Sequence, residues 1–108
     1  MASPLHRAAE KGDLGEMRRL IDMGYNVNDR DNKNRTPLHV AALSGREEVV
    51  LALITELGCD MNVKGKLGQS LLHYACDGGK VGLVKTLILK YKADINVRDD
   101  ENHTPLHA

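Results

Sequence analysis

The chain has 108 residues, and its 15 lysines and arginines balance its 15 aspartates and glutamates. Zero formal net charge argues against a dedicated binder of nucleic acid or of anionic membranes, because such proteins normally carry a basic excess. Three tyrosines with no tryptophan or phenylalanine are too few for base-stacking platforms, and the longest apolar run, residues 49–54, is too short for a membrane span.

The first predicted unit begins at Ser3 and Pro4. This pair predicts a helix start, because the serine hydroxyl can cap a helix and proline suits the first helical position. A pair of alanines follows, and Gly12 predicts the end of this first helix. A second helix and a polar, turn-rich segment complete the unit. That segment contains Asn34, a residue type that tolerates left-handed backbone.

Two further units follow the same plan. The starting signature recurs at residues 36–39, 70–73 and 104–107, which are 33 or 34 residues apart. Gly12, Gly45 and Gly79 keep the same phase, and Gly68 and Asn102 hold the place of Asn34. In the second unit, the apolar residues at 49, 50, 53, 54 and 57 form one face of the second helix.

This pattern resembles the ankyrin repeat family, whose units run about 33 residues with a Thr-Pro-Leu-His-x-Ala signature. The resemblance covers the whole chain. It implies an all-α fold, an ankyrin repeat solenoid of stacked helix–turn–helix units joined by β-turn or hairpin-like loops. We expect a single domain, residues 1–108, with repeats at about 3–35, 36–69 and 70–103 and a partial fourth repeat at 104–108.

The departures from the family pattern are small. Leu71 replaces the usual proline, and Lys92 replaces the glycine that precedes the final turn of a repeat. Repeats two and three each carry one extra residue late in the second helix or just after it. We expect either a slightly longer second helix or a looser turn there.

The two ends of the predicted stack differ. Repeat one has Arg7, Glu16 and Arg19 in slots that are mostly apolar in repeats two and three, which is typical of a terminal repeat with a polar outer face. The far side of repeat three has no such residues. We therefore expect either a fragment of a longer array or self-association through this uncapped C-terminal face.

Histidines recur at the fourth position of each signature, as His6, His39, His73 and His107. Residues in equivalent slots of stacked helices lie about 8–10 Å apart, so they cannot converge on one zinc ion. The resemblance implies that each ring hydrogen-bonds the backbone of the loop between repeats.

Cys59 and Cys76 fill small-residue slots, and both are expected to be buried. Their spacing matches no zinc or redox motif, and no nucleophile, phosphate-loop or metalloprotease motif is found. We expect no enzyme activity, no cofactor and no metal. The two cysteines, whose spacing matches no zinc or redox motif, and the absence of a secretory signal pattern favour an intracellular protein, cytoplasmic or nuclear.

Asn28, Asn62 and Asn96 occupy the asparagine slot of the family pattern. One interpretation is that each side chain bonds the backbone of the following turn. The resemblance also implies that an asparaginyl hydroxylase can modify asparagine in this slot, so both interpretations stay open.

By resemblance, a partner protein docks on the concave surface formed by the turn tips and first helices. The tips carry net charges of +1 over residues 29–35, +2 over 63–69 and −2 over 97–103. This predicts a partner that is acidic opposite the first two tips and basic opposite the third, unless the tips are charged only because they are solvated. The residues that map to this surface are Arg30, Asn32, Lys33, Arg35, Leu43, Ser44, Lys64, Lys66, Leu67, Gln69, Asp77, Arg98, Asp100, Glu101 and His103.

The function that these observations favour is a protein–protein interaction scaffold. The alternative is a regulatory ankyrin segment of a larger enzyme, channel or kinase. We expect another protein as partner, its identity unknown, and neither nucleic acid nor membrane.

Overall fold

The computed structural model describes residues 3–105, over which the chain is helical and contains no strand. This confirms the all-α prediction. The last part of the fourth signature, including His107, lies outside the described residues. The helices are α1 (Pro4–Lys11), α2 (Leu14–Asp22), α3 (Pro37–Leu43), α4 (Glu47–Thr55), η1 (Lys66–Gly68), α5 (Leu71–Asp77) and α6 (Val81–Leu89).

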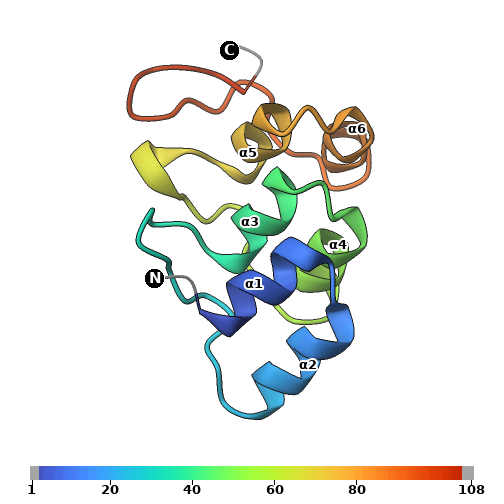
Figure 1. Cartoon of the computed structure of the whole chain (residues 1–108). Helices are drawn as coiled ribbons and strands as arrows, with labels where there is room; N and C mark the ends of the chain where they lie inside the picture. Colours follow the sequence, from blue (N-terminus) through green and yellow to red (C-terminus); the bar gives the residue numbers. More distant parts are fainter. Residues whose placement is uncertain (1–2, 106–108) are drawn as a thin grey trace.

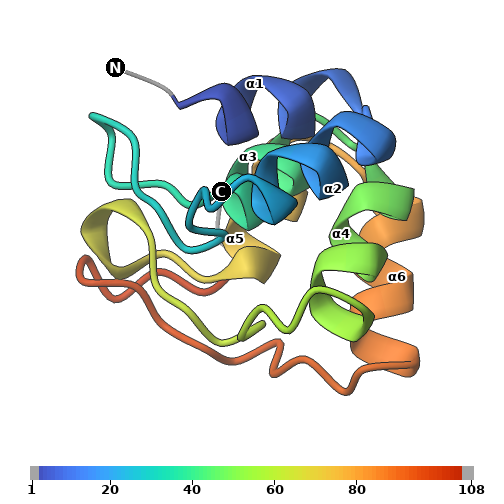
Figure 2. The same ribbon diagram turned by 90° about the horizontal axis from the view of Figure 1, so that it is seen from below.

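The helices form three stacked pairs, as Figure 1 shows. Each first helix packs on the second helix of its own repeat, while α3 lies between α1 and α5. Seen along the stack in Figure 2, the long loops project from one side of the first helices, and α2, α4 and α6 cover the other. The protein is elongated, with extents of 38 × 28 × 20 Å.

Each first helix begins with the predicted cap. The side chains of Ser3, Thr36 and Ser70 accept hydrogen bonds from the backbone N–H groups of His6, His39 and His73, respectively. Leu71 takes the place of proline without moving the helix start, because the Ser70 hydroxyl supplies the cap.

Left-handed backbone occurs where the sequence predicted it. Gly12 and Gly79 follow the first helices of repeats one and three with φ values of 75° and 67°. In the loops, Asn34 and Asn102 have φ values of 59° and 66°. These residue types reverse the chain because they adopt this conformation at low cost.

The extra residue of repeats two and three lies in the turn, because all three second helices have nine residues. In repeat one, the N–H of Tyr25 donates to the carbonyl of Leu20, five residues earlier. In repeat two, the equivalent bond runs from Cys59 to Leu53, six residues earlier, and repeat three repeats it from Ala93. The looser turn is therefore confirmed, and the longer helix is not formed.

A continuous apolar core runs through the stack. Its fully buried members come from all three repeats and include Leu5, Met17, Leu38, Leu53, Leu83 and Leu87. One repeat is too thin to bury both of its faces, so its neighbours supply the missing contacts.

The predicted polar N-terminal face is confirmed. Arg7 and Arg19 are exposed, and Arg19 pairs with Glu16 on the surface of α2. In repeat two, the slots of Arg7 and Glu16 hold Val40 and Val49, which are buried.

The other side of the stack presents Val81. Its slot in repeat two holds Glu47, and the hydroxyl of Thr86 in repeat three donates to the Glu47 carboxylate over 3.0 Å. This slot therefore faces the following repeat, and Val81, with 63 % of its surface exposed, faces away from repeat two. Self-association through this face stays a prediction.

Candidate partner-binding surface

Three hairpins form the loop side of the molecule, where Figure 2 places them side by side. We call them hairpin one (residues 29–35), hairpin two (63–69) and hairpin three (97–103). Equivalent backbone bonds close them, donated by the N–H of Asp31 to Arg35, of Gly65 to Gln69 and of Asp99 to His103. The scaffold thus presents the three tips in one row.

Histidine rings fasten the hairpins to the first helices. In His6, Nδ1 accepts from the Ser3 N–H, so the proton is on Nε2, which donates to the Arg35 carbonyl over 2.7 Å. His73 makes the same link to the His103 carbonyl. His39 instead donates to Val63, at the start of hairpin two. These bonds confirm the predicted structural role, although the link to hairpin two is displaced.

Hairpins one and three are each built around an aspartate. The carboxylate of Asp31 accepts from the N–H groups of Lys33 and Arg35, and Asp99 accepts from those of Glu101 and His103. Burial alone would raise the pKa of Asp31, but its hydrogen bonds and the Arg35 guanidinium bring that pKa below its ordinary value.

Hairpin two has Gly65 where the other hairpins have aspartate. The space is taken by Tyr74 of α5, whose hydroxyl accepts from the Lys66 N–H over 3.0 Å. A β-carbon at residue 65 would lie 2.5 Å from that hydroxyl oxygen. The Tyr74 ring stacks on His39, with ring centroids 4.7 Å apart. The tyrosine and the glycine are therefore matched to each other.

This exchange changes the tip of hairpin two. Leu67 adopts left-handed backbone with φ of 55°, whereas Lys33 and Glu101, in the same place of the other hairpins, do not. No carboxylate at residue 65 can accept from the Leu67 N–H, so the turn is free to rearrange. The Leu67 carbonyl then accepts from the Asp100 N–H over 2.9 Å, which joins hairpins two and three.

The arginines of the predicted surface hold the hairpins together. Arg30 donates to the backbone carbonyls of Asn34 and Lys64, which joins hairpins one and two. Arg35 pairs with Asp31 within hairpin one. In hairpin three, Arg98 donates to the Asn102 carbonyl. These cations therefore have structural partners already.

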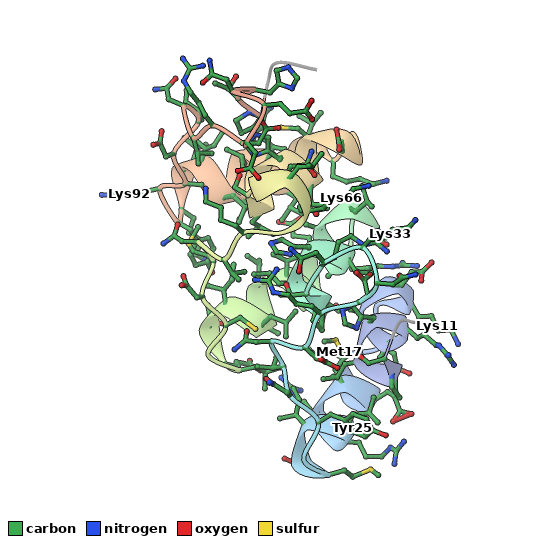
Figure 3. All side chains as sticks on the ribbon, turned by 90° about the vertical axis from the view of Figure 1, so that its left-hand side faces the viewer. Lys11, Met17, Tyr25, Lys33, Lys66 and Lys92 are labelled. Carbon is green, nitrogen blue, oxygen red and sulfur yellow. The ribbon has the colours of Figure 1, made fainter. Side chains whose placement is uncertain are left out.

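The lysines differ from the arginines. Lys33, Lys64 and Lys66 are exposed, and none forms an ion pair within residues 3–105. Figure 3 shows Lys33 and Lys66 on the same side of the molecule, while Lys92 lies on the other. Hairpin three presents the exposed carboxylates of Asp100 and Glu101 instead.

The remaining predicted surface residues flank the tips. Asn32 is exposed in hairpin one, and Leu43 and Ser44 are half-buried at the end of α3. An open hollow beside hairpin three brings together Gln69, Asp77 and His103, with His73, Asp99, Thr104 and Pro105 as its other lining residues. The predicted set thus divides into a basic region at hairpins one and two and a hollow at hairpin three.

The predicted structural role of Asn28, Asn62 and Asn96 is wrong. Their side chains are exposed and make no hydrogen bond within residues 3–105. Each turn is held instead by a side chain two residues earlier, which accepts from the asparagine's N–H; these acceptors are Asn26, Asp60 and Asp94. Their own 34-residue spacing is a sequence signal for such turns.

The cysteines show no sign of reactivity. Burial raises the pKa of the Cys59 thiol to about 11. Cys76 is half-buried rather than buried as predicted, and burial together with Asp77 raises its pKa too. A thiol with a raised pKa is a poor nucleophile at neutral pH. Across residues 3–105 no cluster of side chains suits a metal ion, and no helix is long and apolar enough to cross a membrane.

Comparison with known proteins agrees with this geometry. A family model described as ankyrin repeats (3 copies) matches residues 2–65, and one described as ankyrin repeats (many copies) matches residues 62–107. The human ankyrin repeat domain-containing protein 7 is 47 % identical over 53 residues, which cover 48 % of this chain and 21 % of that protein.

Two further relatives are much longer proteins. The Arabidopsis thaliana potassium channel SKOR is 43 % identical over 56 residues, covering 52 % of this chain and 7 % of the channel. The mouse protein phosphatase 1 regulatory subunit 12A is 45 % identical over 53 residues, covering 49 % of this chain and 5 % of that subunit. The matches thus span about a fifth or less of each of these relatives.

Proposed function

Because this chain belongs to the ankyrin repeat family, we propose that it is a protein-interaction scaffold that binds a partner protein across the hairpin tips and the ends of the first helices. Ankyrin repeats are non-catalytic interaction modules. The observation that carries the proposal is the set of exposed lysines on hairpins one and two, which form no ion pair within the described residues 3–105, beside the carboxylates of hairpin three. The net charge changes sign between hairpins two and three, which favours a partner of complementary charge over charge that serves solubility alone.

The partner in this proposal is acidic where it meets Lys33, Lys64 and Lys66, and basic where it meets Asp100 and Glu101. The arginines contribute indirectly, because Arg30 joins hairpins one and two, and Arg98 bonds within hairpin three. A preorganised surface binds more tightly, since less conformational freedom is lost on association. We propose neither nucleic acid nor membrane as partner, and no cofactor.

The double variant Lys64→Glu, Lys66→Glu tests this surface. A photoreactive residue at Asn32 first captures partners, and the cross-linked segment of a captured protein becomes the ligand. We expect the double variant to weaken binding several-fold or more, mainly through a slower association rate that depends on salt. The matched control is Lys85→Glu, Lys90→Glu, which reverses two exposed lysines on and just after α6. Equal losses from both pairs would place the binding site elsewhere.

A second candidate function is regulation within a larger enzyme, channel or kinase. The relatives favour it, because a potassium channel and a phosphatase regulatory subunit contain matching segments. In that case the partner surface belongs to the same polypeptide. The mass of the natural polypeptide, detected with an antibody against this chain, separates a small scaffold from a segment of a larger protein.

The exposed Asn28, Asn62 and Asn96 side chains are proposed hydroxylation sites, because an enzyme can reach them without breaking a side-chain hydrogen bond. We expect incubation with an asparaginyl hydroxylase to add the mass of one oxygen atom for each modified residue. Peptide mass spectrometry identifies the site, and substitution of that asparagine by aspartate serves as the control. An unchanged mass contradicts the prediction.

A further inference from the structure

Leu67 combines two features that rarely occur together on a protein surface. It is a large apolar residue with 47 % of its surface exposed, and its backbone is left-handed. Its carbonyl is fixed by the Asp100 N–H. The side chain therefore stands at the tip of hairpin two on a backbone that neighbouring hydrogen bonds hold in place.

This conformation has an energetic cost. In a left-handed residue other than glycine, the β-carbon lies unfavourably close to the backbone, and asparagine offsets this cost through local hydrogen bonds of its short side chain. In hairpins one and three, asparagine takes up this conformation, at Asn34 and Asn102. Lys92 shares this backbone conformation with φ of 56°, but its side chain is charged and lies on the other side of the molecule. Leu67 differs because its exposed side chain is apolar, and an apolar side chain held in solvent on strained backbone indicates a role outside folding.

The charged surroundings of Leu67 define the kind of ligand. Lys66 precedes Leu67 in the same tip, and Lys33 holds the place of Leu67 in hairpin one. Arg30 joins these two hairpins through its bond to the Lys64 carbonyl. The two hairpins thus carry three ammonium groups, none of them ion-paired in the described part of the chain, and one exposed apolar side chain. Hairpin three supplies the opposite charge, because Asp100, whose backbone N–H donates to the Leu67 carbonyl, has an exposed carboxylate.

We infer that hairpins one and two recognise an acidic protein segment carrying an apolar side chain, which packs on Leu67 while its carboxylates pair with Lys33, Lys64 and Lys66. This inference rests on the proposed function and specifies its partner. A nucleic acid strand fits less well, because its phosphates would meet the carboxylates of Asp100 and Glu101 of hairpin three.

The probes are three defined ligands titrated into the isotope-labelled full chain. One is a peptide of alternating aspartate and leucine, the second has serine in place of every leucine, and the third is single-stranded oligothymidylate. We expect the leucine peptide to shift the amide resonances of residues 29–35 and 63–69. We expect the serine peptide to bind about tenfold more weakly, because the apolar contact is lost.

The matched variants are Leu67→Asn and Lys92→Asn. Both residues are exposed and left-handed, and asparagine suits that backbone, so neither variant is expected to lower the unfolding temperature. Leu67→Asn should reduce the affinity for the leucine peptide to that for the serine peptide, whereas Lys92→Asn should leave it unchanged. A residue with only a structural role would not lose binding while keeping stability.

Three results overturn the inference: equal affinity for the two peptides, unchanged binding by Leu67→Asn, or tighter binding of oligothymidylate than of the leucine peptide. These results leave the proposed function standing if captured partners still cross-link at Asn32 and the charge-reversal pair weakens them. If captured partners cross-link only from the α6 side, through a photoreactive residue at Lys85, the proposed function fails as well.

Discussion

Gly65→Asp is expected to destabilise the folded chain by about 3 kcal/mol, although aspartate is the residue that builds hairpins one and three. A β-carbon at residue 65 would lie 2.5 Å from the Tyr74 hydroxyl oxygen and 2.8 Å from the nearest ring carbon. The tyrosine is buried and stacked on His39, so it cannot move aside without losing that contact. The added carboxylate would also lack the space in which Asp31 accepts its bonds.

The double variant Gly65→Asp, Tyr74→Val should recover much of this loss. Val40 holds the slot of Tyr74 in repeat two and accompanies Asp31 of hairpin one, so the double variant copies a pair that the chain already uses. The introduced aspartate would then accept from the N–H groups of Leu67 and Gln69. Urea unfolding of the parent, both single variants and the double variant gives the coupling energy. If the two losses simply add, Gly65 and Tyr74 are not matched.

His39 is expected to make the chain lose about 3 kcal/mol of stability between pH 6.5 and pH 4. Burial lowers the pKa of His39 from 6.5 to about 4 in the folded chain. Nδ1 accepts from the Thr36 N–H and the buried ring stacks on Tyr74, so the charge of an added proton would be shielded from water. Above pH 6.5, the His39 side chain is neutral in both the folded and the unfolded chain. As the pH falls below 6.5, only the unfolded chain binds the proton, and folding weakens until the pH reaches about 4.

His39→Gln separates this effect from other titrations. Glutamine at the third helical position preserves the capping box with Thr36, and it does not titrate. The variant is expected to be less stable at pH 7 but to show a much flatter stability curve between pH 6.5 and 4. Asp31 and Asp99 provide an internal reference. Their pKa values lie below 3.8 in the folded chain, so their contribution is lost only at lower pH in both proteins. An unchanged slope in the variant contradicts the assignment to His39.

The sequence was sufficient for the features that depend on local chemistry. Helix caps at Ser3, Thr36 and Ser70 and left-handed residues at Gly12 and Asn34 follow from residue type and spacing. The histidine links to the loop backbone were predicted from the family resemblance, although the displacement of the His39 link to Val63 was not. The sequence left the place of the extra residue open, and the turn bond from Cys59 to Leu53 decides it.

The candidate site was less predictable, because its details depend on contacts between repeats. The position of Leu67 on a tip was predicted, but its left-handed backbone depends on Tyr74, which lies in another repeat and fills the space beside Gly65. The sequence also did not predict that the arginines have partners within the described residues while the lysines form no ion pair there. Arg30 and Lys64 are 34 residues apart, and only the stacked structure shows their bond.

The match between Gly65 and Tyr74 also limits how this chain can gain or exchange repeats. The repeat signature places them in different units, since Gly65 lies near the end of repeat two and Tyr74 near the start of repeat three. A tandem duplication of residues 36–69 would set the first copy's glycine opposite a valine, with neither the hydroxyl nor the carboxylate that the tip requires. Grafting residues 70–103 behind hairpin one would set Tyr74 against Asp31. Hairpin two and α5 therefore have to be exchanged together. Recombination that keeps them together must join sequences within a repeat rather than at the boundary between two repeats.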